Sequence, residues 1–543
     1  MTAMRVYAGL LGALDAAALV ATRRRCVSLS AAEREALLDR WSRAGLVRRS
    51  LVAAVTTPLK YAHFDDPGVY ALYGAQYDKS APAEPPQPWM RQVTSGADVA
   101  ANETIECDVV VVGTGAGGAV VAKELAEKGL AVAILEEGRY LNRGDFARGS
   151  ILEMQAKLYR HGGLTFTLGN GVIQVPAGRL VGGSTAVNTA TCWRTPEWIL
   201  DHWVKDLALT DLSAERMAPH FDAVWNELGV SFSSREAIGP QGDIVARGCD
   251  ALGYAHQPVW RNARDCDGQG VCDWGCPTDA KRSMNLSYIP SALKSHASLF
   301  TESRADRVWM EDGKAVGLEV VATATKARFG IRARATILAG GALPTPVLLQ
   351  RQGIANTSGQ VGRNLSVHPA TAISALMGER VDPFAHVPQG YAVTQFVREG
   401  ILILGALAPI DAAAAYFLSQ GRSYTELMDA YANVASLGVM VEDHARGRVT
   451  PGPNGFPVIR YMMSKKDARQ LQRGLVEAGK VYLAAGASRL MPAVLGHPML
   501  EGKKGLDAFA AADIGVHRFL MIGFHPLGTC RMGVDPRTSV VDP

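Results

Sequence analysis

The chain has 543 residues, which is long enough for two or three domains. A hydrophobic content of 48% and a charged content of 20% are ordinary for a globular protein, and a net charge of +4 is too small to indicate a nucleic-acid-binding protein. Eight cysteines in so long a chain exclude a small disulfide-stapled scaffold.

Residues 1–78 are predicted to form a small helical region. The apolar run at the start of this region is interrupted by Asp15 and is followed by the arginines at 23–25, so it differs from a signal peptide. It is also shorter than the roughly 20 apolar residues that span a bilayer. We expect an amphipathic helix and a cytoplasmic protein, with peripheral attachment to a membrane left open. Ser30 and Glu33 form a capping-box pattern that predicts a helix through Trp41.

Residues 79–104 are predicted to be a linker or an extended surface segment. They contain Pro82, Pro85, Pro86 and Pro88, and so many prolines can neither pair in a sheet nor continue a helix. This segment separates the helical region from the next domain.

The most informative stretch is residues 107–138. An apolar strand over residues 109–112 leads into Gly113-x-Gly115-x-x-Gly118, a short helix follows, and Gly129 is placed to stop it. The first glycine of the motif allows a tight turn, the second lets the backbone approach a pyrophosphate, and the third lets the helix pack against the strand.

A second apolar strand, over residues 130–135, ends in Glu136. An acid at this distance from the glycine motif accepts hydrogen bonds from a ribose hydroxyl. Glycine loops alone are often only turns. Here strand, loop, helix, strand and acid occur in order, which predicts dinucleotide binding.

Residues 177–194 contain a second glycine pair. Gly182, Gly183 and Ser184 resemble another close approach of the backbone to a ligand, with Asn188 as a polar neighbour. Taken alone, an ordinary loop explains the same residues better.

The following region contains helical patches over residues 195–260 without obvious chemistry. Glu311-Asp312-Gly313 between two apolar runs predicts a hairpin. An apolar strand over residues 335–339 then leads through Gly340-Gly341 into a predicted helix.

Residues 370–515 are predicted to mix strands with one clear helix. Leu471, Leu475, Ala478 and Tyr482 fall on one face of that helix. The apolar run 401–409 fits a buried strand better than a contact with an apolar substrate.

Three cysteines are clustered as Cys266-x5-Cys272-x3-Cys276. Three thiolates at this spacing could bind an iron–sulfur cluster. The alternatives are thiols packed in a loop, a disulfide, or a structural zinc that lacks its fourth ligand.

Five motifs occur in the order seen in the glucose–methanol–choline (GMC) oxidoreductases, and the chain resembles this family from residue 105 to 543. The motifs are GTGAGG with its strand-end acid, GRLVGGSTAVN, ILAGGALPTPVLLQRQGI, VGRNLSVHP and GFHPLGTCRMG. The helical N-terminal region and the cysteine segment resemble the branch of long-chain alcohol oxidases and related bacterial dehydrogenases.

The resemblance implies FAD and an α/β fold in which a Rossmann-like FAD-binding domain is interleaved with an α+β substrate domain on an antiparallel sheet. The FAD-binding parts would be 105–195 and 286–366, the substrate parts 196–285 and 367–515, and the catalytic segment 516–543. Some sugar dehydrogenases of the family carry a [3Fe-4S] cluster on a similar cysteine pattern. Such a cluster would pass electrons to a carrier.

The resemblance also implies roles for individual residues. The ADP half of FAD would be held by Gly113, Gly115, Gly118 and Glu136, with Gly340 nearby, and the flavin half by Gly182, Gly183, Ser184 and Asn188.

The chemistry requires a base. An alcohol gives up hydride readily only if its hydroxyl proton also leaves, and neutral histidine suits that role near pH 7. His525 in GFHPLGTCRMG matches the family's active-site histidine, whereas His368 lies in a segment that is structural in the family. Family members continue beyond SVVDP with a second active-site histidine or asparagine, so we expect a truncated chain with weak or no activity.

These features predict an FAD-dependent enzyme that oxidises a lipophilic primary alcohol. The alternatives are a sugar or polyol dehydrogenase that passes electrons to a carrier, and a non-catalytic flavin-binding protein. The N-terminal helices could also be a docking module for an electron acceptor, although a simple helical cap explains them as well.

Overall fold

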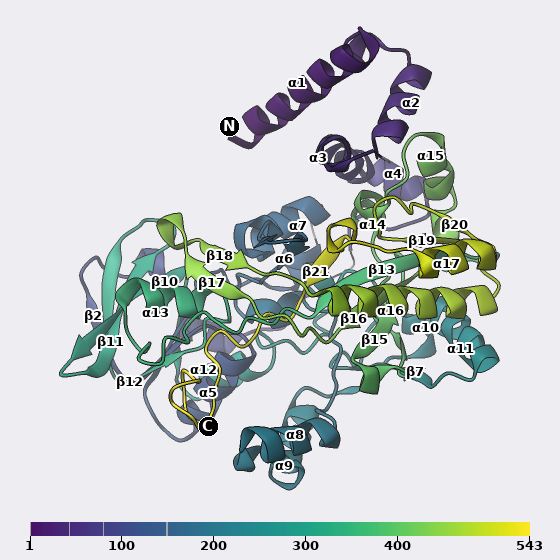
Figure 1. The fold of residues 1–543 in the computed structure, drawn as a ribbon. Helices are drawn as coiled ribbons and strands as arrows, with labels where there is room; N and C mark the ends of the chain where they lie inside the picture. The colour runs from purple at the N-terminus through teal and green to yellow at the C-terminus, as the bar shows by residue number, and fades with distance from the viewer. Residues whose placement is uncertain (1, 43, 80, 148–149) are drawn as a thin grey trace.

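The computed structural model describes residues 2–42, 44–79, 81–147 and 150–543. It contains two large sheets, with a group of N-terminal helices beside the second (Figure 1).

The first sheet has seven strands and contains the predicted dinucleotide motif. Its first five strands are parallel neighbours, and the last two form an antiparallel hairpin, which confirms the predicted turn at residues 311–313. Buried aliphatic side chains cover both faces of this sheet, as expected for a parallel sheet. In spatial order the strands are β1 (Val93–Ser95), β9 (Ser298–Thr301), β3 (Val132–Leu135), β2 (Thr104–Val112), β12 (Arg328–Leu338), β11 (Lys314–Ala322) and β10 (Ser303–Glu311).

The helices of the two predicted strand–glycine–helix steps are α5 (Ala116–Glu127) and α13 (Pro344–Gln352). Gly129 follows α5 with a φ of +84° and ends it, as predicted.

The second sheet has nine strands and is mainly antiparallel. The strands of its main path are β20 (Leu500–Glu501), β19 (Arg489–Pro492), β13 (Pro369–Leu376), β16 (Val434–Val441), β15 (Ile401–Gly405), β14 (Tyr391–Val393) and β7 (His256–Pro258). β21 (Met521–Gly523) pairs with β13 and, in parallel, with β5 (Ile173–Gln174), which comes from the chain preceding the second glycine pair.

The predicted helix is α16 (Lys465–Ala484), which packs on the second sheet. Its predicted apolar face is fully buried, and β15 is the predicted buried strand. A small sheet of β17 (Arg448–Pro451), β18 (Pro457–Arg460) and β4 (Thr167–Leu168) lies between the two large ones, and β6 (Ser231–Phe232) pairs with β8 (Trp260–Arg261). The remaining helices are α6 (Arg143–Ala147), α7 (Ile151–Leu158), α8 (Glu197–Leu207), α9 (Ala214–Glu227), α10 (Arg235–Ile238), α11 (Pro240–Leu252), α12 (Tyr288–Lys294), α14 (Ile410–Tyr416), α15 (Arg422–Asp429) and α17 (Gly502–Ala511).

The N-terminal region is helical, as predicted. It consists of α1 (Thr2–Thr22), α2 (Ala31–Ser42), α3 (Leu46–Phe64) and α4 (Pro67–Leu72). α1, α2 and α3 share a small apolar core, and α3 packs on α14. Ser30 and Glu33 form the expected reciprocal bonds, with each side chain accepting from the other residue's backbone N–H.

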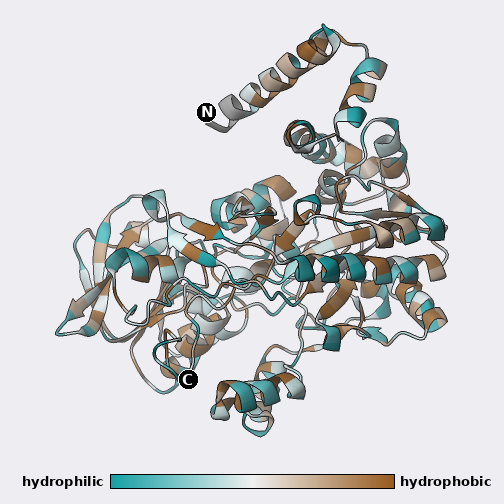
Figure 2. Cartoon of the chain, viewed as in Figure 1, coloured by the Kyte–Doolittle hydropathy of each residue, from teal (hydrophilic) through white to brown (hydrophobic). Residues whose placement is uncertain are grey.

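α1 extends away from the rest of the molecule and is largely apolar (Figures 1 and 2). Across the described ranges, no helix is both long enough and apolar enough to cross a membrane. The predicted fold class is confirmed: a Rossmann-like sheet, an interleaved domain on an antiparallel sheet and a small helical N-terminal region.

Candidate cofactor and active site

Two of the glycine segments meet where β2 and β12 end side by side. β2 and β12 pair in parallel up to Val112 and Leu338, so the glycines that follow them are neighbours. Gly113 has a φ of +101°, and a Cβ there would lie 2.5 Å from the Ala339 carbonyl oxygen and 3.2 Å from the Cα of Gly340. A side chain at Gly113 would therefore collide with backbone, so the tight turn requires glycine at this position.

The third glycine of the motif is equally constrained. A Cβ on Gly118 would lie 2.0 Å from the Gly113 carbonyl oxygen, so only glycine lets α5 pack this close to the strand end. Gly115 and Gly117 differ, because a Cβ on either would meet nothing within 4 Å. The backbone on their side of the loop is open.

The open side is the N-terminus of α5. Gly115 is the residue before the helix, and within the described residues no side chain caps it, while Ala116 and Gly117 are exposed. The first N–H groups of a helix lack intrahelical partners and carry the positive end of its dipole. This end of α5 suits the negative charge of a pyrophosphate.

Glu136 lies at the end of β3 and is buried. Its carboxylate accepts hydrogen bonds from the Thr114 N–H (3.3 Å), the Thr114 hydroxyl (2.5 Å) and the Gly138 N–H (2.9 Å). Burial raises the pKa of this carboxyl above its usual value, although these three bonds act in the opposite direction. A carboxylate has about four acceptor positions, so a ribose hydroxyl could still donate to Glu136.

The second glycine pair lies against the first motif. Gly182 and Gly183 have φ values of +98° and +53°, and a Cβ on Gly183 would lie 3.0 Å from the Cα of Gly115. The Gly182 N–H donates to the Thr114 hydroxyl at 3.0 Å. The structure therefore brings Gly113, Gly115, Gly118, Glu136, Gly182, Gly183 and Gly340 together.

Ser184 and Asn188 follow this loop, and their side chains make local bonds. The Ser184 hydroxyl accepts from the Gly178 N–H at 3.0 Å, and the Asn188 carbonyl Oδ1 accepts from the Ala190 N–H at 3.1 Å. A glycine cradle, an uncapped helix N-terminus and a strand-end acid fit the ADP half of FAD; the residues that would face the flavin ring remain a prediction.

His525 lies two residues after β21, and its side chain is exposed although protein surrounds part of the ring. The His368 ring lies 5.6 Å away, centroid to centroid, with the two planes at 66°. Desolvation, and secondly the nearby His368, lower the pKa of His525 to about 4. His525 is therefore neutral at pH 7.

His368 was not expected at this site. Pro369 pairs with Gly523, and Ser366 exchanges backbone hydrogen bonds with Leu527. His368 and His525 lie between these two pairs of residues, one on each segment. In the sequence, His368 and His525 have one feature in common, because each precedes a proline. The strand register that brings them together joins segments more than 150 residues apart and cannot be read from local patterns.

The cysteine segment corrects one expectation. All eight cysteines are free thiols, and the described residues contain no group of three His, Cys, Asp or Glu arranged to hold a metal ion. The buried guanidinium of Arg261 donates to the sulfurs of Cys266 (3.7 Å) and Cys272 (3.2 Å), and the Lys281 N–H donates to that of Cys276 (3.4 Å). Burial raises the pKa of the Cys272 thiol to about 11, although Arg261 and Lys281 act in the opposite direction. The iron–sulfur cluster considered from the cysteine spacing is therefore not supported.

The cysteine segment instead supports the second glycine loop. The Lys281 ammonium is buried and donates to the carbonyls of Ala186 (2.9 Å), Asn188 (2.7 Å) and Cys272 (2.7 Å). This one cation therefore joins the cysteine loop to the loop expected to face the flavin.

Comparisons with known proteins agree with this architecture. Models of the GMC oxidoreductase family match residues 155–370 and 443–543, and an FAD binding domain matches residues 108–155. Among solved structures, pyridoxine 4-oxidase from Mesorbium loti has a TM-score of 0.60 at 20% identity, over 80% of this chain and 91% of that one. A variant of formate oxidase from Aspergillus oryzae has a TM-score of 0.57 at 14% identity, over 82% of this chain and 91% of that one. These two structures share the fold.

Relatives in sequence are closer. An uncharacterized GMC-type oxidoreductase of Mycobacterium tuberculosis is 32% identical over 437 residues, which are 80% of this chain and 69% of the relative. A long-chain-alcohol oxidase of Arabidopsis thaliana is 29% identical over 470 residues, and the match spans 81% of this chain but 62% of the plant enzyme. The chain therefore belongs to the GMC oxidoreductase family and is an FAD-dependent oxidoreductase.

Proposed function

We propose that the chain oxidises the CH–OH group of a lipophilic primary alcohol, with His525 as the base. The observation that carries this proposal is the position of His525, which follows the end of β21 with its ring against that of His368. FAD, when bound, supplies the acceptor for the hydride. The protein must then remove the hydroxyl proton and hold the alcohol in place.

A neutral imidazole has one ring nitrogen with a free lone pair, and that nitrogen can accept the hydroxyl proton. Protonation of His525 is opposed by its desolvation and by the adjacent His368. Because His525 is exposed, the proton that it accepts passes to water, and the ring returns to the form that acts as a base.

Apolar side chains near β21 support a lipophilic substrate. Leu164, Phe166, Leu168 and Val172 are exposed in β4 and in the segments between residues 164 and 172 that precede β5, and β5 pairs directly with β21. Phe524, next to His525, is also exposed. Exposed apolar residues in such a group mark an interaction surface, and one beside the proposed base suits an alkyl chain better than a sugar.

For the location of the enzyme, we propose peripheral contact with an anionic membrane. Residues 1–64 hold ten of the chain's 56 basic residues and only four of its 52 acidic residues. The exposed side of α1 carries apolar residues that include Leu19 and Val20. Basic charge beside an exposed apolar helix face favours anionic lipid. Cosedimentation with vesicles that contain or lack anionic lipid tests this, and a Val20→Glu variant should bind less.

The test of the proposed function is anaerobic spectroscopy of the purified flavoprotein with a panel of fatty alcohols and sugars. Loss of the oxidised flavin spectrum with fatty alcohols would support the proposal, and loss with sugars alone would favour the sugar dehydrogenase alternative. A flavin spectrum that no alcohol changes would contradict both. Reoxidation of the reduced protein by oxygen or by an artificial carrier would then identify the class of acceptor.

A further inference from the structure

The segment that carries His368 is fixed by one buried carboxylate. Asp443, which is 2% exposed, accepts hydrogen bonds from three consecutive residues of that segment. The donors are the Ser366 hydroxyl, the Val367 N–H at 3.0 Å and the His368 N–H at 3.4 Å. The Tyr461 hydroxyl donates to the same carboxylate at 2.7 Å.

His368 needs such support because its backbone is strained. Its φ is +47°, in the left-handed region, and Pro369 follows it. A residue before proline is biased towards extended conformations, and histidine in the left-handed region costs free energy that the surroundings must offset. Strand pairing on both sides and the bonds to Asp443 together hold His368 in this conformation.

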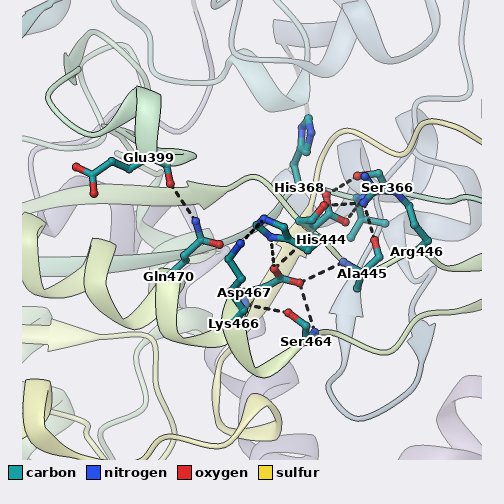
Figure 3. A network of polar contacts seen from close by, with 12 residues as sticks. Ser366, His368, Glu399, His444, Ala445, Arg446, Ser464, Lys466, Asp467 and Gln470 are labelled. Carbon is teal, nitrogen blue, oxygen red and sulfur yellow. Dashed lines mark hydrogen bonds and ion pairs between the residues drawn. The ribbon is translucent and has the colours of Figure 1, made fainter. Parts of the chain in front are cut away.

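A second buried carboxylate fixes the turn that carries Asp443. Asp467, which is fully buried, accepts from the His444 N–H (3.1 Å), the His444 Nδ1 (2.8 Å) and the Ala445 N–H (3.4 Å). It also forms the capping box of α16 with Ser464. Figure 3 shows these bonds converging on the turn beside His368.

We propose that Asp443 is a positioning residue for the reaction: it holds the His368 ring against the His525 ring and so fixes the orientation of the base. This inference rests on the proposed function of His525. Asp443 acts only through His368, and its contacts explain why a strained histidine is kept beside a second histidine.

The charged and titratable groups around this unit are few. His368 is the group that faces His525, while Tyr461 and Asp467 lie around Asp443, and Arg446 donates to the Asp443 carbonyl at 2.6 Å. His444 contacts Asp467 on one side and Lys466 at 2.8 Å on the other. A change in the titration of His525 after substitution at Asp443 would therefore be transmitted through His368.

Asp443→Asn is the informative substitution. Each carboxylate oxygen of Asp443 faces a backbone N–H, Val367 on one side and His368 on the other. In either orientation the asparagine places its NH2 group against one of these N–H donors, so one of the two hydrogen bonds to the segment is lost. Tyr461→Phe is the matched control, because it removes one hydrogen bond to Asp443 and leaves the three bonds to residues 366–368.

The experiment is an NMR titration of histidine-labelled protein, with the His525 signal assigned as the one lost in a His525→Gln variant. We expect His525 to titrate near pH 4 in the wild type and in Tyr461→Phe. In Asp443→Asn and in His368→Phe we expect the midpoint to rise by about one pH unit, because the neighbouring imidazole is displaced or absent. Reduction of the flavin by alcohol should slow about tenfold to a hundredfold in Asp443→Asn, with flavin content unchanged.

An unchanged His525 midpoint in Asp443→Asn and His368→Phe would overturn the inference. If Asp443→Asn fails to fold, Ser366→Ala removes a single bond to the carboxylate and should give a smaller shift in the same direction. The titration does not depend on turnover. If the wild type oxidises no alcohol, the proposed function is contradicted, but the His525 midpoints still test the positioning role of Asp443.

Discussion

The imidazole rings of His368 and His525 lie edge to face, with centroids 5.6 Å apart. The His368 ring adds to desolvation in lowering the pKa of His525. The pairing joins β13 to β21 and gives the proposed base a neighbour that opposes its protonation.

Substitution of the base is the first prediction. His525→Asn should reduce the rate of flavin reduction by alcohol about 10²- to 10⁴-fold, the usual contribution of a general base. Flavin content should not change, because none of the glycine contacts is touched. Stopped-flow absorbance measures both quantities. His497→Asn is the control, since His497 also precedes a proline but packs on Phe509. Equal losses in the two variants would contradict the role of His525.

The pH dependence of the same step is the second prediction. The pKa of His525 is lowered to about 4, so its neutral form is populated at every pH above that value. The rate of flavin reduction should stay level as the pH falls from 8 to about 5 and should decline only near pH 4. A decline centred near 6.5, the ordinary pKa of histidine, would show that desolvation does not control this group.

The glycine cradle gives a third prediction with an internal control. Gly118→Ala would place a Cβ 2.0 Å from the Gly113 carbonyl oxygen, whereas Gly117→Ala, one residue away, meets nothing within 4 Å. We expect Gly118→Ala to lose bound flavin and about 1–3 kcal/mol of stability. Gly117→Ala should keep its stability. Flavin absorbance per protein and thermal unfolding test the pair, and flavin retention in Gly118→Ala would refute the close approach.

The sequence predicted the fold well where a local pattern carried the signal. Gly113 and Gly118 indicated a strand–turn–helix unit, and the apolar face around Leu475 indicated α16, because each signal lies within a short stretch of the sequence. The interleaving of the two sheets came only through the family resemblance, since it depends on pairings such as β5 with β21.

The site was less predictable for the same reason. His368 came to lie beside His525 through a register between distant strands, and Asp443 had no motif to mark it. The cysteine spacing left a metal cluster open as one interpretation, but it could not show that the buried Arg261 donates to two of the three sulfurs. The spacing shows which ligands are available but not how the loop folds around them.

The contact between the N-terminal helices and the second domain gives the fourth prediction. The Tyr70 hydroxyl of α4 donates to Oδ1 of Asp411 in α14 at 2.8 Å, and the Ala412 N–H donates to the same oxygen at 2.9 Å. Asp411 is fully buried, and among the described residues Oδ2 has no hydrogen-bond partner. Burial raises the pKa of Asp411 from 3.8 to about 6, although these two bonds act in the opposite direction.

The sign of the effect on stability follows from this shift. Between pH 4 and 6 the unfolded chain loses the Asp411 proton while the folded chain keeps it, so this residue makes folding less favourable as the pH rises. A difference of two pKa units corresponds to about 3 kcal/mol of unfolding free energy, and this amount is lost in full above pH 6. Asp411→Asn keeps the Oδ1 acceptor and cannot ionise. Its unfolding free energy relative to wild type should therefore rise from pH 4 to pH 7, as measured by urea denaturation. A difference independent of pH would mean that Asp411 is already ionised in the folded protein, and that the contact with α4 holds a buried charge.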